Sequence, residues 1–188
     1  MTILAVRTFN DPILRKKAQK IAAITPHIKK LAQDMLETMY LSKGIGLAGP
    51  QVGISESIIT IDISQDGESL NPMPLINPEI IKTRGQCEYE EGCLSVPGFR
   101  GSIVRPEQIT VRYSTLEGEV MTLPVKGLLA RVIQHEMDHL NGILFTDFLD
   151  QNWWDSEEGK QMELDHPKFM RETQYRVEKN KQPITQSK

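Results

Sequence analysis

The stretch GLLARVIQHEMDHLNGILF, residues 127–145, carries the strongest helical pattern in the chain, and an Asn-Gly pair near its end is a typical helix stop. It contains His135, Glu136 and His139 in the pattern H-E-x-x-H, which places residues i and i+4 on one helical face. Two imidazoles on one face can bind a single metal ion, and Glu136 can reach a water molecule bound to that ion. The sequence therefore predicts a buried helix that carries a metal site.

The third metal ligand is less certain from the residues alone. A catalytic zinc-type site has three protein ligands and keeps an open position for water. Cys93, in the segment EEGCLSVPG, offers a thiolate, which is a strong soft ligand, but a small buried hydrophobic residue is an equal interpretation. His27, His166 and several carboxylates also remain open as the third ligand. Cys87 is expected to be a packed strand residue.

The remaining elements give an α+β order, not an alternating βαβ order. A helix is expected from residue 26 to near Gly44, and an extended piece before a turn at Pro97-Gly98. Strands are expected in the ranges 57–64, 75–82, 108–115 and 119–125, the last two forming a hairpin.

The length of 188 residues suits one domain with a tail, and the composition shifts after Asp150. We expect a catalytic domain at 1–150 and an extension at 151–188 that is partly helical at 168–179 and frayed at 183–188. A net charge of −3 without a basic stripe argues against nucleic-acid binding. Neither a signal peptide nor a run of 18 apolar residues is recognisable, and two cysteines six positions apart make no disulfide framework, so the expected compartment is a reducing cytoplasm.

Three segments together resemble the signature motifs of the peptide deformylases: GIGLAGPQ at 44–51, EGCLS at 91–95 and QHEMDHLNG at 134–142. They occur in the order of that family, and the resemblance covers roughly residues 1–150. It implies an α+β fold in which antiparallel strands surround a central HExxH metal-binding helix, with an N-terminal helix. It also implies a hydrolase that removes the formyl group from the formylmethionine of nascent bacterial polypeptides and releases formate.

The resemblance assigns the metal ligands to Cys93, His135 and His139. The ion is ferrous iron in many members, and Zn²⁺, Ni²⁺ or Co²⁺ can take its place. Gln51 and the backbone amide of Leu94 are expected to polarise the formyl oxygen, and Glu136 to move the protons.

Substrate binding is implied for residues that lie in or next to the same motifs. Arg100 follows the second motif at the spacing of a family arginine near the active site, and Gly46 suits a substrate peptide that adds as a strand. The full expected set is Ile45, Gly46, Gly92, Arg100, Leu128, Arg131 and Val132, with Arg131 and Val132 near the mouth of the methionine pocket. One departure is Gly49, where the family usually has alanine, and this change is expected to loosen the loop that aims Gln51.

The expected partners are formylmethionyl nascent peptides and the ribosome near its exit tunnel, without a role for nucleic-acid sequence or a membrane. Two alternatives share the helix. A zincin-type metallopeptidase would use a downstream ligand such as His166, whereas a metal-stabilised interaction domain would bind a partner without turnover. Replacement of Cys93 distinguishes a deformylase, which should lose its metal, from a zincin, whose metal content should not change. Glu136→Ala distinguishes a deformylase, which should lose turnover, from an interaction domain, which should keep its partner binding.

Overall fold

The computed structural model describes residues 2–64 and 71–166, and within them the chain forms two antiparallel sheets and several helices. The larger sheet has the strand order β1-β2-β3-β6-β7, and β4 pairs with β5 in a separate two-stranded sheet. The strands are β1 (Gly46–Ala48), β2 (Ile58–Ile61), β3 (Met73–Arg84), β4 (Cys87–Cys93), β5 (Val96–Arg105), β6 (Gln108–Ser114) and β7 (Val120–Lys126). The helices are η1 (Pro12–Arg15), α1 (Pro26–Leu41), η2 (Gly49–Val52), α2 (Gly127–Leu140), η3 (Phe145–Phe148), α3 (Gln151–Trp154) and α4 (Glu157–Asp165).

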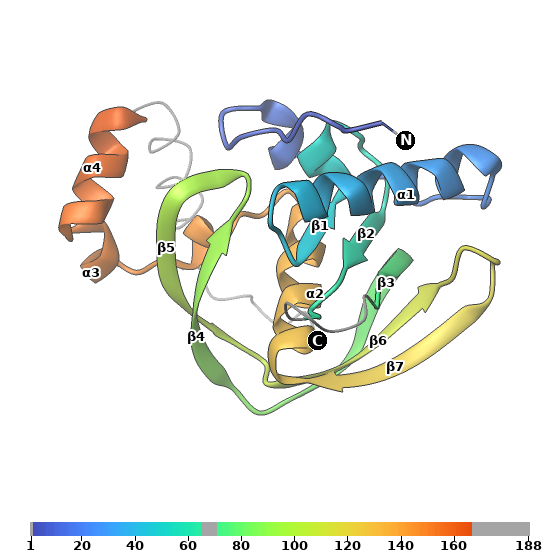
Figure 1. Cartoon of the computed structure of the whole chain (residues 1–188). Helices are drawn as coiled ribbons and strands as arrows, with labels where there is room; N and C mark the ends of the chain where they lie inside the picture. The colour runs from blue at the N-terminus through green and yellow to red at the C-terminus, as the bar shows by residue number, and fades with distance from the viewer. Residues whose placement is uncertain (1, 65–70, 167–188) are drawn as a thin grey trace, which may run out of the picture.

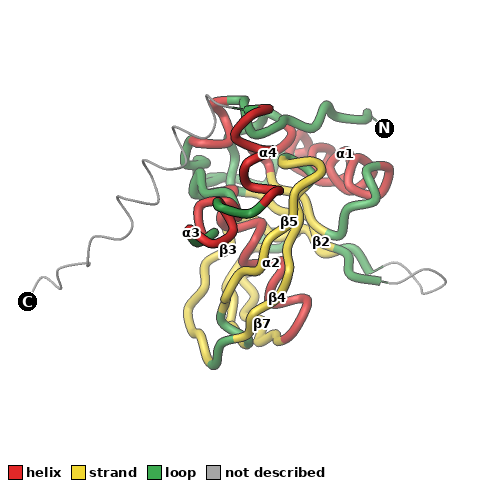
Figure 2. Tube along the Cα trace, turned by 90° about the vertical axis from the view of Figure 1, so that its left-hand side faces the viewer, coloured by secondary structure: helices red, strands yellow, loops and turns green. Residues whose placement is uncertain are grey.

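Helix α2 lies in the middle of the molecule, with β4 and β5 on one side and the larger sheet on the other (Figure 1). The view turned by 90° likewise places strands around it (Figure 2). The expected α+β class is therefore confirmed in its coarse form. The helix ends at Leu140 with Asn141 as its C-cap, and Gly142 takes a φ of 72°, a left-handed conformation that glycine adopts without steric cost.

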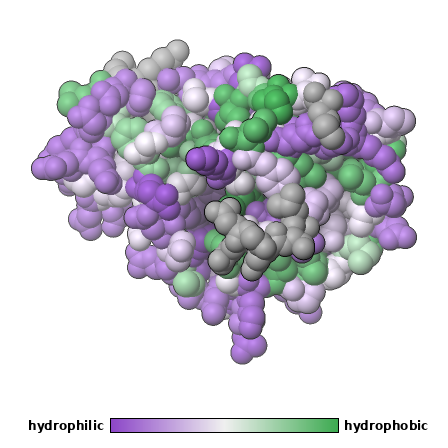
Figure 3. Space-filling model, viewed as in Figure 1, coloured by the Kyte–Doolittle hydropathy of each residue, from purple (hydrophilic) through white to green (hydrophobic). Residues whose placement is uncertain are grey.

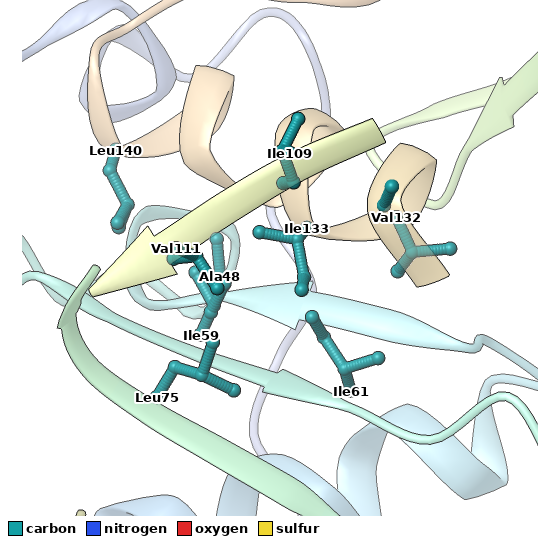
Figure 4. Close-up of a cluster of buried hydrophobic side chains, with 10 residues drawn as sticks. Ala48, Ile59, Ile61, Leu75, Ile109, Val111, Val132, Ile133 and Leu140 are labelled. Carbon is teal, nitrogen blue, oxygen red and sulfur yellow. The ribbon is translucent and has the colours of Figure 1, made fainter. Parts of the chain in front are cut away.

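The larger sheet is covered on both faces because its buried residues alternate between two cores. Ile58 and Ile76 pack with side chains of α1, whereas Ile59 and Leu75 pack with side chains of α2. Figure 4 shows the second core, in which Ile133 of α2 meets side chains of the strands. All residues of β2 are buried for this reason, so its sequence is a continuous run of apolar residues and threonine rather than an alternation.

Most expected elements are present, and one expected turn is wrong. The turn between β4 and β5 falls at Leu94 and Ser95, while the predicted turn residues Pro97 and Gly98 lie within β5. Gly98 does adopt a positive φ of 85°, so it bends the strand without ending it. Pro78 lies where the pairing of β3 with β6 shifts register, between Ile76 and Glu79.

The first part of the extension packs on the outer side of β5, where α3 and α4 lie in Figure 1. The division at residue 150 stays a prediction, and the helix expected at 168–179 and the frayed end at 183–188 lie outside the described residues. Hydrophilic and hydrophobic residues are interspersed on the face shown in Figure 3. Within the described ranges, no helix is both long and apolar enough to cross a membrane.

Candidate active site

Two elements, β4 and α2, bring the predicted metal ligands together. Cys93 ends β4, and His135 and His139 lie one turn apart on α2. Their ligand atoms all lie within 4.8 Å of one another, and Cys93 Sγ is 3.2 Å from His139 Nε2. Both histidines are buried, and burial holds the pKa of His139 well below its usual value, so its ring stays neutral and can act as a ligand.

His135 is oriented by a carboxylate. Its Nδ1 lies 2.8 Å from Oε2 of Glu91, which leaves Nε2 available for a ligand. Burial alone would raise the pKa of Glu91, but hydrogen bonds from His135 and Arg105 outweigh it and lower that pKa to about 2. Glu91 is therefore ionised at neutral pH and can accept the Nδ1 proton.

Glu91 also belongs to a buried ionic network that holds β4, β5 and α2 together. Arg105 binds both oxygens of Glu91 at 2.6 and 2.9 Å, and it binds Asp138 at 2.6 Å. Arg131 Nη1 lies 2.6 Å from Glu91 as well. Asp138, the fourth residue of the H-E-x-x-H pattern, is thus one member of this network.

Glu136 is buried beside the ligands, and its Oε2 has no hydrogen-bond partner among the described residues. Burial is the main reason that the pKa of Glu136 rises to about 7, so the carboxyl group can exchange a proton near neutral pH. A Cβ atom at Gly46 would lie 2.5 Å from Glu136 Oε1. The glycine therefore allows β1 to approach this carboxyl group.

Gln51 is buried in η2, and both ends of its amide are held. Its Oε1 accepts a hydrogen bond from the Ala48 backbone, while Nε2 donates to Ser95 Oγ at 3.2 Å and lies 3.6 Å from Cys93 Sγ. The amide NH₂ group therefore points toward the cysteine. Gly49 does not open this loop, because a Cβ there would lie 2.6 Å from the carbonyl oxygen of Glu56. The loop is thus tightly packed at the position expected to loosen it.

A single cavity of about 650 Å³ connects the ligands to the outside. Of the predicted site residues, His139 alone does not line the cavity, because it is more deeply buried in the protein than His135. The predicted residues that line it are Ile45, Gly46, Gln51, Gly92, Cys93, Leu94, Arg100, Leu128, Arg131, Val132, His135 and Glu136. The structure thus brings together residues that are up to 91 positions apart, from Ile45 to Glu136.

Two arginines of this wall are held by partners that the sequence did not indicate. Arg131 is buried, and its guanidinium binds Glu91 and the carbonyl oxygens of Ile103 and Cys87, so it does not stand free at the mouth. Arg100 pairs with Glu90 at 2.5 Å, not with Glu91. His166, the third ligand of the zincin alternative, lies 4.4 Å from the Phe9 ring between centroids, and the metal-ligand cluster does not include it.

The family model of the polypeptide deformylases matches residues 3–153, which is most of the chain. This chain belongs to the peptide deformylase family. Peptide deformylases are metal-dependent hydrolases that remove the N-formyl group from nascent peptides, and this member has that activity.

The sequences and structures of related deformylases align with this deformylase over most of their length. The peptide deformylase of Nitrosococcus oceani is 51% identical over 148 residues, which are 79% of this chain and 87% of that protein. The crystal structure of the Synechococcus elongatus deformylase in complex with actinonin has a TM-score of 0.80 at 42% identity and covers 84% of this chain and 86% of its own. A Met-Ala-Ser-bound deformylase of Acinetobacter baumannii has a TM-score of 0.74 at 37% identity, with 79% of this chain and 99% of its own covered.

Glu91, Ser95 and Arg105 are site residues that the sequence reasoning did not single out. Glu91 could have been found, because it lies two positions before Cys93 on a strand and therefore shares its face. Arg105 carried no such signal, since its partners Glu91 and Asp138 are 14 and 33 positions away.

Proposed function

We propose that this deformylase binds one divalent ion through Cys93, His135 and His139, and that Glu136, Gln51 and Leu94 perform the chemistry around it. One observation carries the proposal: three ligand atoms converge within 4.8 Å beside a buried carboxylate, one oxygen of which has no hydrogen-bond partner in the described part of the chain. The set fits a catalytic transition-metal ion, because thiolate and imidazole are suitable ligands and three protein ligands leave a position open. We propose Fe²⁺ as the native ion, with Zn²⁺, Ni²⁺ or Co²⁺ as substitutes.

When bound, such an ion supplies Lewis acidity and lowers the pKa of a bound water to about 7. Glu136 accepts a proton from the attacking water through its carboxylate, and its burial keeps bulk water from competing for that proton. The water oxygen bonds to the formyl carbon, the C–N bond breaks, and Glu136 delivers the proton to the leaving amine. Formate and a free N-terminal methionine are the products.

Negative charge on the formyl oxygen needs donors that are already in place. Gln51 Nε2 is held in place by two hydrogen bonds of its amide, one accepted by Oε1 and one donated by Nε2. The second donor is the backbone N–H of Leu94, which lies at the turn directly after Cys93. Removal of one such donor typically lowers kcat by about 10²–10³-fold. We propose that Ile45, Leu128, Arg131 and Val132 bind the methionine side chain, and that Gly46, Gly92 and Arg100 bind the peptide that follows it.

The substrate class follows from the relatives. The Acinetobacter baumannii neighbour holds Met-Ala-Ser, which is the product expected from formyl-Met-Ala-Ser. We propose that this chain takes formylated nascent peptides in a bacterial cytoplasm as they leave the ribosome, since its relatives are bacterial. Cosedimentation with ribosomes that carry a stalled formylated chain tests this placement.

The primary experiment measures formate release from formyl-Met-Ala-Ser by protein purified without oxygen, with and without a chelator. Chelator-sensitive release is expected from the wild type. Glu136→Ala should keep its metal and lose turnover, whereas Cys93→Ser should lose metal. Turnover that persists in Glu136→Ala with full metal content would refute the role assigned to Glu136.

A further inference from the structure

One wall of the cavity is a two-stranded sheet with few supports of its own. Gly98, Phe99 and Arg100 of β5 line the cavity opposite α2, and within residues 2–64 and 71–166 β4 is the one strand that pairs with β5. A two-stranded sheet by itself is marginally stable in water. The ionic network of Glu91 and Arg105 ties one part of this wall to α2, and the position of residues 98–100 depends in addition on what packs against the outer side of β5.

The extension covers that outer side. Trp154 and Met162 of the extension belong to one buried cluster with Leu149, which precedes the extension, and with Val96 and Ile103 of β5. The partly buried side chains of Cys93, Phe99 and Trp153 pack against the same cluster. The extension thus contacts the strand whose opposite side faces the substrate, and it reaches the immediate surroundings of a predicted metal ligand.

A hydrogen bond attaches the extension to the wall at one point. Trp153 Nε1 donates to the carbonyl oxygen of Arg100 at 2.9 Å. Arg100 pairs across the sheet with Gly92, which directly precedes Cys93, so the hydrogen bond holds β5 opposite the end of β4. The side chain of Arg100 is held separately by Glu90, so Arg100 is fixed at both its backbone and its guanidinium.

The chain is adapted to this contact. Gly101 follows Arg100 and is buried, and a Cβ atom there would collide with the side chain of Leu149 and lie 3.3 Å from Trp153 Nε1. A glycine at this position lets Leu149 and the indole approach the backbone of β5. A loosely attached tail would not require such a close approach.

We propose that Trp153 is a positioning residue that holds residues 98–100 of β5 in place for the part of the substrate downstream of formylmethionine. This inference rests on the proposed function of the cavity. Trp153 touches no reacting atom, so its loss should weaken binding of the downstream residues without slowing the chemistry. The extension then acts as a part of the substrate site.

The test compares full-length Trp153→Phe with wild type on formyl-Met-Ala-Ser and on formyl-Met amide. Phenylalanine keeps an aromatic ring and removes the donor. We expect KM for the tripeptide to rise about 3- to 10-fold, with kcat and metal content unchanged and with KM for the short substrate unaffected. Leu164→Ala is the control, because Leu164 is exposed on α4 and is not a member of the cluster that packs on β5, so its KM values should equal those of wild type.

A second measurement does not depend on activity. Hydrogen exchange without substrate should be faster at residues 98–101 in Trp153→Phe and unchanged in α2. Equal KM shifts for both substrates, a fall in kcat together with metal content, or unchanged exchange would each overturn the proposal. If the wild type released no formate, the proposed function would fail, while the exchange data would still test the attachment.

Discussion

The Nδ1 atom of His135 lies 2.8 Å from a carboxylate oxygen of Glu91, so a residue of β4 fixes the first histidine of the α2 motif. Two arginines bind the same carboxylate, Arg105 through two contacts and Arg131 through one. The proposed metal ligand His135 is thus held by a buried carboxylate that both arginines also bind. Such partners of ligating histidines set the ring orientation and the basicity of the ligand nitrogen.

Glu91→Gln should weaken metal binding. The amide keeps the shape of the side chain but carries no charge, so it holds the His135 ring less firmly and leaves two buried guanidinium groups undercompensated. We expect metal affinity to fall about 10- to 100-fold, measured by competition with a chromophoric chelator. Glu90→Gln removes an exposed carboxylate one residue away and serves as the control. Equal affinities in both variants would show that Glu91 does not support the site.

Gly46→Ala should lower kcat by displacing the Glu136 carboxyl group. The new methyl group would lie 2.5 Å from Glu136 Oε1 and 2.8 Å from Val132 Cγ1, so one of these side chains must move. Steady-state kinetics should show a loss of at least about 10²-fold, since misplaced acid–base groups forfeit most of their contribution. Gly92→Ala meets only atoms at 3.6 Å or beyond and is the control for folding and metal content. Normal kcat in Gly46→Ala would contradict the tight approach of β1 to α2.

Metal removal should destabilise the fold, because the three ligands come together only in the native state. A free metal concentration of about 1,000 times Kd stabilises the folded state by about 4 kcal/mol. A chelator should therefore lower Tm by about 10 °C. Differential scanning calorimetry measures the shift. Glu136→Ala should show the same shift as wild type, whereas Cys93→Ser should show little. An unchanged Tm in wild type after verified metal loss would mean that binding and folding are not linked here.

Asp62 should contribute to stability in a pH-dependent way. Burial opposes its ionisation, but hydrogen bonds from Ser64, Tyr40 and Asn71 outweigh burial and hold the pKa of Asp62 below its ordinary value. Because the pKa of Asp62 is lower in the folded state, its ionisation stabilises the fold at pH values above the unfolded-state pKa of about 3.9. This contribution is lost as the pH falls through the folded-state pKa.

Urea unfolding of wild type and Asp62→Asn at several pH values tests this linkage. The free energy of unfolding of the wild type should exceed that of Asp62→Asn by a constant amount above about pH 5. This advantage should shrink in more acidic solution. Both proteins must carry the same metal content. An advantage that grows on acidification would have the opposite sign and would exclude a lowered pKa for Asp62.

The sequence indicated the local features of the site better than the long-range ones. Periodicity and the Asn-Gly stop placed α2, and the motifs named the residues that line the cavity. The turn after Cys93 was misplaced because Pro97 and Gly98 are common turn residues, yet here pairing with β4 continues past both of them. Arg105 could not be predicted, because its role depends on β5 and α2 lying side by side, a tertiary relation that no local pattern encodes.

The separation of Gln51, Cys93 and His139 along the chain has a consequence for the order of folding. Contacts among them span 42 and 46 positions, so they close only after distant segments have found each other. Each pairing of this kind adds to the contact order and slows folding, since loop-closure entropy is lost before the contact forms. During synthesis no ion can find its full ligand set before residue 139 has left the ribosome. An ion held by the three proposed ligands would therefore bind only after most of the catalytic domain has been synthesised.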